Sequence, residues 1–192
     1  MDIQHVNLKL HLRHSGTVDL EPLIPIFHDW VREQSCEETL VDVADYRHVP
    51  AGPGILLVGH EADFSLDWSD NRLGVRYNRK ARVAGENHDR FRQALRAALM
   101  TCRKLEEDGR LDGKLGFESR EFELGVNDRL LAPNCQDTYA SLSPEIGFFC
   151  DGLFGRNSYS VTHQSDPRRR FSVLVQTPRP MDRDGLLEAL SP

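Results

Sequence analysis

Near the N-terminus, apolar and polar residues alternate along the chain. The apolar positions are Val6, Leu8, Leu10 and Leu12, and the positions between them are Asn7, Lys9 and His11. This period of two is typical of a β-strand that buries one face and exposes the other to solvent. We therefore predict a strand with a wet polar face, ended by the polar and glycine residues at 14–16.

Apolar residues recur at helical spacing in three longer segments. The first predicts a helix over residues 20–34, in which Pro25 fits only if the helix begins late or is irregular there. The second, over residues 88–107, has the clearest apolar face in the chain. The third predicts a helix or broken helix over residues 137–154, where Pro144 suits a first helical position.

Two hairpins are predicted where strand-like runs flank short turn signals. They pair residues 55–68 with 73–77 around a turn at 69–71, and residues 159–163 with 171–175 around a turn at 165–167. Further strand signals lie at 40–44 and 115–126. The Pro/Gly-rich stretch at 49–54 is predicted to be a rigid structural loop, since each proline disfavours helix in the residue before it.

This order of elements predicts an α+β fold with one domain over residues 1–192. Hairpins require antiparallel pairing, so we expect a mostly antiparallel sheet with amphipathic helices packed on one face. The order also suggests two similar β-α-β-β halves, 1–85 and 110–178, joined by the helix at 88–107 and followed by a tail at 179–192. A doubly wound nucleotide-binding fold is disfavoured, because strands and helices do not alternate regularly and no GxGxxG occurs.

Composition narrows the classes of partner and location. The 192 residues carry a formal net charge of −6, which weighs against nucleic acid as the main partner. No apolar run approaches the roughly 20 residues needed to span a bilayer, and the alternating N-terminus does not resemble a signal peptide. We therefore expect a cytoplasmic protein with no membrane association. Its four cysteines have irregular gaps and no CxxC pair, so reduced thiols are expected, with Cys102 and Cys150 in the core.

Residues 42–80 hold the densest set of chemically capable side chains. The candidates for binding are Asp42, Asp45, His48, His60, Glu61, Arg76, Arg79 and Lys80. Imidazole and carboxylate groups can bind a metal or move protons, but no HxH or HExxH spacing occurs. Pairing of the strands at 40–46 and 55–62 would separate the two histidines, which leaves Asp42 and His60 as the nearest candidate metal pair. The alternative is that His60 lies at a sheet edge beside solvated carboxylates.

Basic residues form two further candidate features. An acidic strand carrying Glu61, Asp63 and Asp67 precedes a basic one carrying Arg72, Arg76 and Lys80. Such strands can form cross-strand ion pairs, or the arginines can bind a phosphate or carboxylate. Arg168, Arg169 and Arg170 follow one another at a predicted hairpin turn, where they are either exposed turn charge or a contact for nucleic acid or an acidic partner.

No spacing in the chain matches a specific catalytic signature. We therefore expect a non-enzymatic protein that binds a protein partner or small ligand, and that forms a homo-oligomer. The alternative is a metal-assisted enzyme that uses the His/Asp/Glu cluster in residues 42–63. Nucleic-acid or anion binding through Arg76, Arg79, Lys80 and the three consecutive arginines ranks third because of the net charge. The sequence indicates no particular cofactor.

Overall fold

The computed structural model describes residues 1–13, 18–113 and 115–191, so the strand end expected at 14–16 lies outside the described residues. Within them, eight strands form one antiparallel sheet in the order β2-β3-β4-β5-β1-β6-β8-β7, and the fold is α+β as predicted. The strands are β1 (Val6–His11), β2 (Leu40–Tyr46), β3 (Gly54–Gly59), β4 (Ala62–Asp67), β5 (Gly74–Arg79), β6 (Glu121–Val126), β7 (Ser160–His163) and β8 (Ser172–Gln176). The helices are α1 (Leu23–Glu33), α2 (Asn87–Glu107), α3 (Gln136–Phe154) and α4 (Arg183–Ala189), with 3₁₀ turns at Ser69–Asn71 and Gly109–Leu111.

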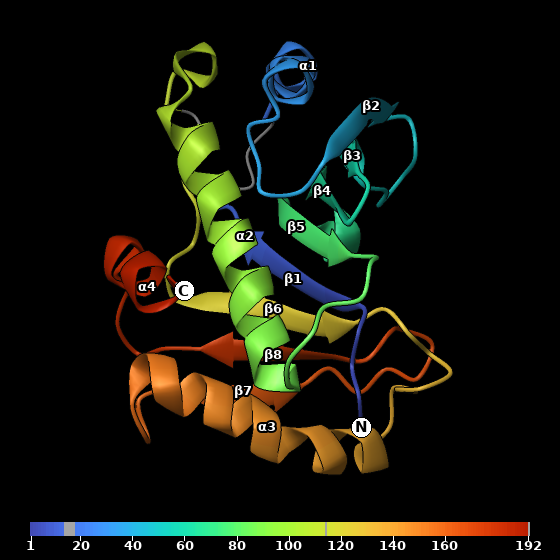
Figure 1. The fold of residues 1–192 in the computed structure, drawn as a ribbon, viewed down its shortest axis with the longest axis vertical. Coiled ribbons are helices and arrows are strands. Elements are labelled where there is room, and N and C mark those ends of the chain that lie inside the picture. The colour runs from blue at the N-terminus through green and yellow to red at the C-terminus, as the bar shows by residue number, and fades with distance from the viewer. Residues whose placement is uncertain (14–17, 114, 192) are drawn as a thin grey trace.

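The helices gather on one face of the sheet, and α2 crosses in front of its centre (Figure 1). The long helix was predicted over 88–107 and is found at Asn87–Glu107. Its apolar side is buried against β1 and β5, with Phe91, Leu95 and Leu99 each at most 2% exposed. A capping box between Glu86 and Asp89 satisfies two backbone amides at the start of the helix.

The prolines affect α1 and α3 differently. α1 begins at Leu23, which places Pro25 in the first turn, where its missing N–H is not needed. In α3, the prediction that Pro144 opens a helical segment is wrong, because the helix continues through it from Gln136 to Phe154. Leu142 and Ile146 on either side are fully buried, so core packing holds this turn despite the proline.

The sheet order reveals pairings that the sequence did not predict. β1 and β6 meet at the centre, and each pairs on its other side with the last strand of the hairpin in its own half, β5 or β8. The hairpin turn at Ser69–Asn71 is confirmed. The strand predicted to continue from 55 to 68 is instead two strands, β3 and β4, which turn at His60 and Glu61. The similarity of the two halves stays a prediction.

The wet face predicted for β1 is wrong. All six of its residues are buried, and the polar ones, Asn7, Lys9 and His11, are 3%, 0% and 3% exposed. The strand lies in the middle of a wide sheet, where the Ser69 turn contacts Lys9 from the open side. Polar groups on β1 are therefore enclosed between the sheet and the loops over its open face.

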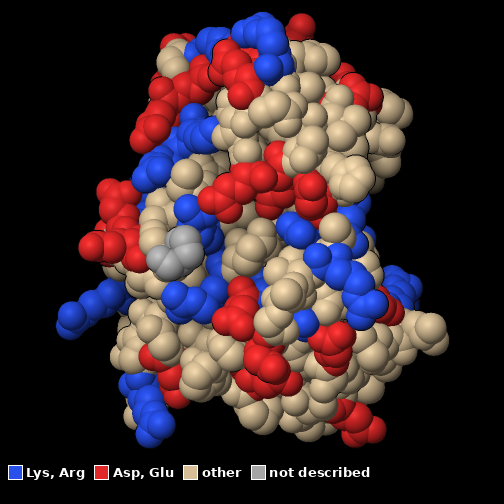
Figure 2. Space-filling model, in the orientation of Figure 1, with Lys and Arg blue, Asp and Glu red and all other residues tan. Residues whose placement is uncertain are grey.

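All four cysteines are free thiols, and Cys102 and Cys150 are buried as predicted. On the helix-covered side that Figure 2 shows, acidic and basic side chains are interspersed instead of forming a patch of one sign. Within the described parts of the chain, no helix combines the length and the apolar character required to cross a lipid bilayer.

Candidate functional site

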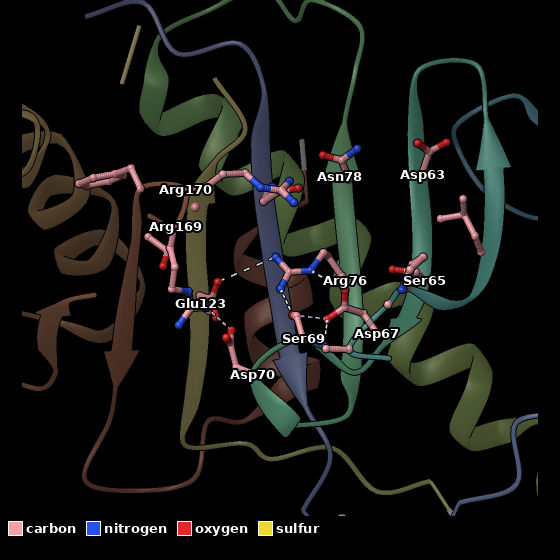
Figure 3. Close-up of a pocket in the computed structure, with 18 of the residues that line it drawn as sticks. Asp63, Ser65, Asp67, Ser69, Asp70, Arg76, Asn78, Glu123, Arg169 and Arg170 are labelled. Atoms are coloured by element: carbon pink, nitrogen blue, oxygen red, sulfur yellow. Dashed lines mark hydrogen bonds and ion pairs between the residues drawn. The ribbon is translucent and has the colours of Figure 1, made fainter. Parts of the chain in front are cut away.

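The open face of the sheet, opposite the helices, carries a polar pocket of about 460 Å³ (Figure 3). Its floor is formed by side chains of the central strands, and its rim by the loop at 51–53, the Ser69–Asn71 turn and the loop between β7 and β8. Residues that line it include Asn7, Leu56, Asp63, Ser65, Asp67, Asp70, Arg76, Asn78, Glu123, Gly125, Arg129, Arg168, Arg169, Arg170 and Ser172.

A closed ion-pair cluster supports the floor. Lys9 Nζ lies 2.7 Å from Asp67 Oδ1 and donates to the backbone oxygen and hydroxyl of Ser69, each at 3.0 Å. Arg76 adds a second cation, with its Nε 3.3 Å from Asp67 Oδ2, and lies 3.9 Å from Glu123 Oε1 (Figure 3). Two cations and two carboxylates balance in this cluster, so it fixes the floor without leaving net charge.

A second row of the floor consists of uncharged polar residues. The strand register places Asn7 opposite Asn78 on one side and opposite Gly125 on the other, and Gly125 lies opposite Ser172. Asn7 Oδ1 is buried and has no hydrogen-bond partner among the described residues. A side chain at Gly125 would bring its Cβ within 3.1 Å of the Phe171 carbonyl oxygen and 3.7 Å of Asn7 Cβ. The glycine therefore leaves the floor beside Asn7 uncovered.

Arginines dominate the rim. Arg169 pairs with Asp70 across the pocket, and Arg168 pairs with Asp166 at 2.8 Å within its own turn. Arg129 instead donates to the backbone oxygen of Arg168 at 2.8 Å, and Arg170 donates to Asn127 Oδ1 at 2.8 Å. Across the described residues, neither Arg129 nor Arg170 has a carboxylate partner within ion-pair distance.

The pKa of Arg170 reflects this excess of positive charge at the rim. Figure 3 shows its side chain reaching over β1 toward the middle of the pocket. Arg170 remains exposed overall, yet desolvation of its guanidinium, followed by the positive charge of Arg76 and Arg129, lowers its pKa. A cation placed beside two other cations is stabilised by an anion. The rim can therefore attract a negatively charged group.

Among the candidates from sequence, the three basic residues separate between the two faces. Arg76 lies in the pocket, and Lys80 pairs with Asp63 at its edge, with Nζ 2.7 Å from Oδ1. Arg79 points to the helix-covered side, where its Nη1 lies 3.9 Å from Glu38 Oε1. The period of two along β5 accounts for this, because Arg76 and Arg79 are three residues apart.

The acidic and histidine candidates lie away from the pocket. Asp42 and Asp45 are on the edge strand β2, and Asp45 pairs with Arg47 at 2.7 Å. Asp42 lies opposite Val58, not His60, because the register pairs Tyr46 with Gly54 and His60 lies beyond the end of β3. His48 is exposed beyond the end of β2.

His60 and Glu61 form the turn between β3 and β4. His60 Nδ1 is 3.7 Å from Glu61 Oε1, and Glu61 Oε2 accepts a hydrogen bond from the Thr39 amide at 2.8 Å. Within the described ranges, no three His, Cys, Asp or Glu side chains are grouped so that they could hold a metal ion. This geometry gives no support to a metal-assisted mechanism in residues 42–63.

Several pocket residues were not among the sequence candidates. Asn7, Asn78 and Arg129 come from three distant segments, and no local pattern distinguishes them from ordinary strand or turn residues. Only the alternation of polar residues on β1 was a usable signal, and it was interpreted as a solvent face. The sequence leaves Arg169 and Arg170 as either turn charge or a contact for nucleic acid or an acidic partner, and their position against the sheet depends on pairing that local sequence does not reveal.

Comparison with known proteins adds no further constraint. The chain matches no protein-family model, and a search of curated proteins finds no significant match. The interpretation of the pocket therefore depends on its residues and their geometry.

Proposed function

We propose that the protein binds a small anionic ligand, bearing a phosphate or carboxylate group, in the pocket on the open face of its sheet. The observation that carries this proposal is the pair of guanidinium groups on Arg129 and Arg170, which line the pocket without a carboxylate partner among the described residues. Guanidinium groups bind such oxyanions through paired N–H donors.

The local charge contrasts with that of the whole chain. A protein with a formal net charge of −6 repels anions on average, so unpaired arginines concentrated in one cavity mark a specific site. The other charges at the floor and rim are already paired, which leaves these two cations free to act on a ligand. The cavity volume of about 460 Å³ falls in the range of roughly 300–1,000 Å³ that small-molecule sites occupy.

Calorimetric titration with inorganic phosphate and with citrate tests the proposal. The wild-type chain should bind at least one of them, and more weakly as salt rises, because the arginines are partly solvated. The double variant Arg129→Gln/Arg170→Gln should lose about tenfold or more in affinity, in line with the loss of charge-assisted hydrogen bonds. Arg156→Gln removes an exposed arginine outside the pocket and should change nothing. Equal affinity in the double variant, or no binding of either anion, contradicts the proposal.

The expected homo-oligomer and cytoplasmic location stay predictions. Edge strand β2 is the surface that best suits a second copy of the chain, since its backbone has one unpaired edge and Val41 is 57% exposed. Light scattering on the purified chain should give twice the 21.9 kDa monomer mass if β2 pairs with itself. Replacing Val43 by proline should then return the monomer mass.

A further inference from the structure

Asn7 occupies an unusual position for a polar side chain. It lies on the central strand β1, lines the pocket and is only 3% exposed. Its Oδ1 has no hydrogen-bond partner among the described residues. Leaving a buried polar group unpaired destabilises a protein by about 1–3 kcal/mol, and native structures contain few such groups.

A carboxamide requires two different partners. Its oxygen accepts hydrogen bonds and its nitrogen donates them, whichever way the group is turned. A carboxylate or a fully ionised phosphate supplies only acceptors, so it leaves the carboxamide oxygen unsatisfied. A hydroxyl group can donate to the oxygen and accept from a neighbouring N–H, which makes it the natural complement of this part of the floor.

Other residues on the pocket floor also carry uncharged polar groups that could bind a hydroxyl. The side-chain nitrogen of Asn78, Nδ2, has no partner among the described residues, although its side-chain oxygen Oδ1 accepts a hydrogen bond from Asn127 Nδ2 at 3.1 Å. Ser65 and Ser172 are 6% and 4% exposed, and neither hydroxyl is hydrogen-bonded to a described residue. The absence of a side chain at Gly125 gives a ligand access to this row.

We infer that the ligand is a phosphorylated polyol such as a sugar phosphate, with its hydroxyl groups on Asn7 and Asn78 and its phosphate on Arg129 and Arg170. This inference depends on the proposed function, because the arginines hold the charged group. Asn7 and Arg170 line the same pocket, and Figure 3 shows Arg170 over β1, the strand that carries Asn7. Pro53 and Leu56 on the opposite wall supply apolar surface for the carbon skeleton.

Calorimetry with ribose 5-phosphate, inorganic phosphate and ribose on the full chain separates the two claims. Ribose 5-phosphate should bind about tenfold tighter than inorganic phosphate, as expected for one or two added hydrogen bonds. In Asn7→Leu this ratio should fall to about one while phosphate affinity stays unchanged. Equal affinity for both phosphates in the wild type, or an unchanged ratio in Asn7→Leu, overturns the inference and leaves the proposed function standing. If neither phosphate binds, the inference is overturned, and if citrate does not bind either, the proposed function is contradicted as well.

Thermal unfolding of the ligand-free variants gives a second readout. If Asn7 serves a ligand, Asn7→Leu removes an unpaired polar group and should keep or raise the melting temperature. Asn134→Leu is the matched control, because Asn134 is 6% exposed and fully bonded to Gln164, Asp166 and His163. That control should lower the melting temperature by several degrees. An equally large fall in Asn7→Leu would show that Asn7 has a structural role and would overturn the inference.

Discussion

Arg169 and Asp70, which lie 99 residues apart in the chain, form an ion pair across the pocket. Asp70 belongs to the turn between β4 and β5, and Arg169 to the loop between β7 and β8. The pair therefore joins two loops from different halves of the sequence at the mouth of the site. It also neutralises one of the arginines that would otherwise face a bound anion.

The substitution Asp70→Asn should strengthen anion binding. It releases Arg169 to act on the ligand, so phosphate affinity should rise by roughly threefold, the size expected for one partly solvated charge. The unfolding free energy should change by less than about 1 kcal/mol, because both partners are partly exposed. Asp166→Asn releases Arg168 at the more exposed end of the turn and should have a smaller effect. Weaker phosphate binding in Asp70→Asn would contradict this role for the pair.

Removing Lys9 should destabilise the fold strongly. Lys9 is 0% exposed, and its loss would leave the buried Asp67 carboxylate with Arg76 as its remaining cation among the described residues. We expect Lys9→Met to lower the unfolding free energy by about 3 kcal/mol in urea denaturation, near the lower end for breaking a buried ion pair. Lys80→Met removes the partly exposed partner of Asp63 and should cost less than about 1 kcal/mol. Similar losses in the two variants would show that burial of Lys9 does not matter.

His11 should make the protein less stable in mild acid. Burial, followed by the charges of Arg72 and Lys9, lowers its pKa from 6.5 to about 4. The unfolded chain therefore binds more protons than the folded chain between these values, and stability falls as pH drops through 6.5 toward 4. Linkage gives a loss of about 2 kcal/mol at pH 5 relative to pH 7.5. In His11→Gln this part of the pH dependence should disappear; identical pH profiles for variant and wild type would exclude the mechanism.

Local patterns predicted most of the elements. The spacing of Phe91, Leu95 and Leu99 was sufficient for α2, because a helix determines which residues share a face within a few turns. The residues Ser69, Asp70 and Asn71 likewise predicted a turn, because Ser, Asp and Asn favour turn conformations. The turn at His60 was missed, although Gly59 signalled it: a Cβ there would lie 2.4 Å from the Ala62 carbonyl oxygen.

The candidate site could not be assembled from such patterns. Lys9 follows the same alternation as a solvent-facing lysine, and it is buried because the Ser69–Asn71 turn contacts it over the centre of the sheet. Arg129 and Arg170 become neighbours of Arg76 through pairing between strands that are distant in sequence. Of the predicted site residues, Arg76 and Lys80 share one face of the sheet because they are four residues apart on an extended chain.

The most direct test of the central claim is nuclear magnetic resonance of the uniformly ¹⁵N-labelled chain during titration with phosphate. The account predicts saturable shifts of the Nε–H signals of Arg129 and Arg170, while the Nε–H signal of Arg156 stays in place. Saturation would show a specific site, since general salt effects do not saturate in this way. Unchanged signals for Arg129 and Arg170, or shifts of equal size at Arg156, would contradict an anion site in this pocket.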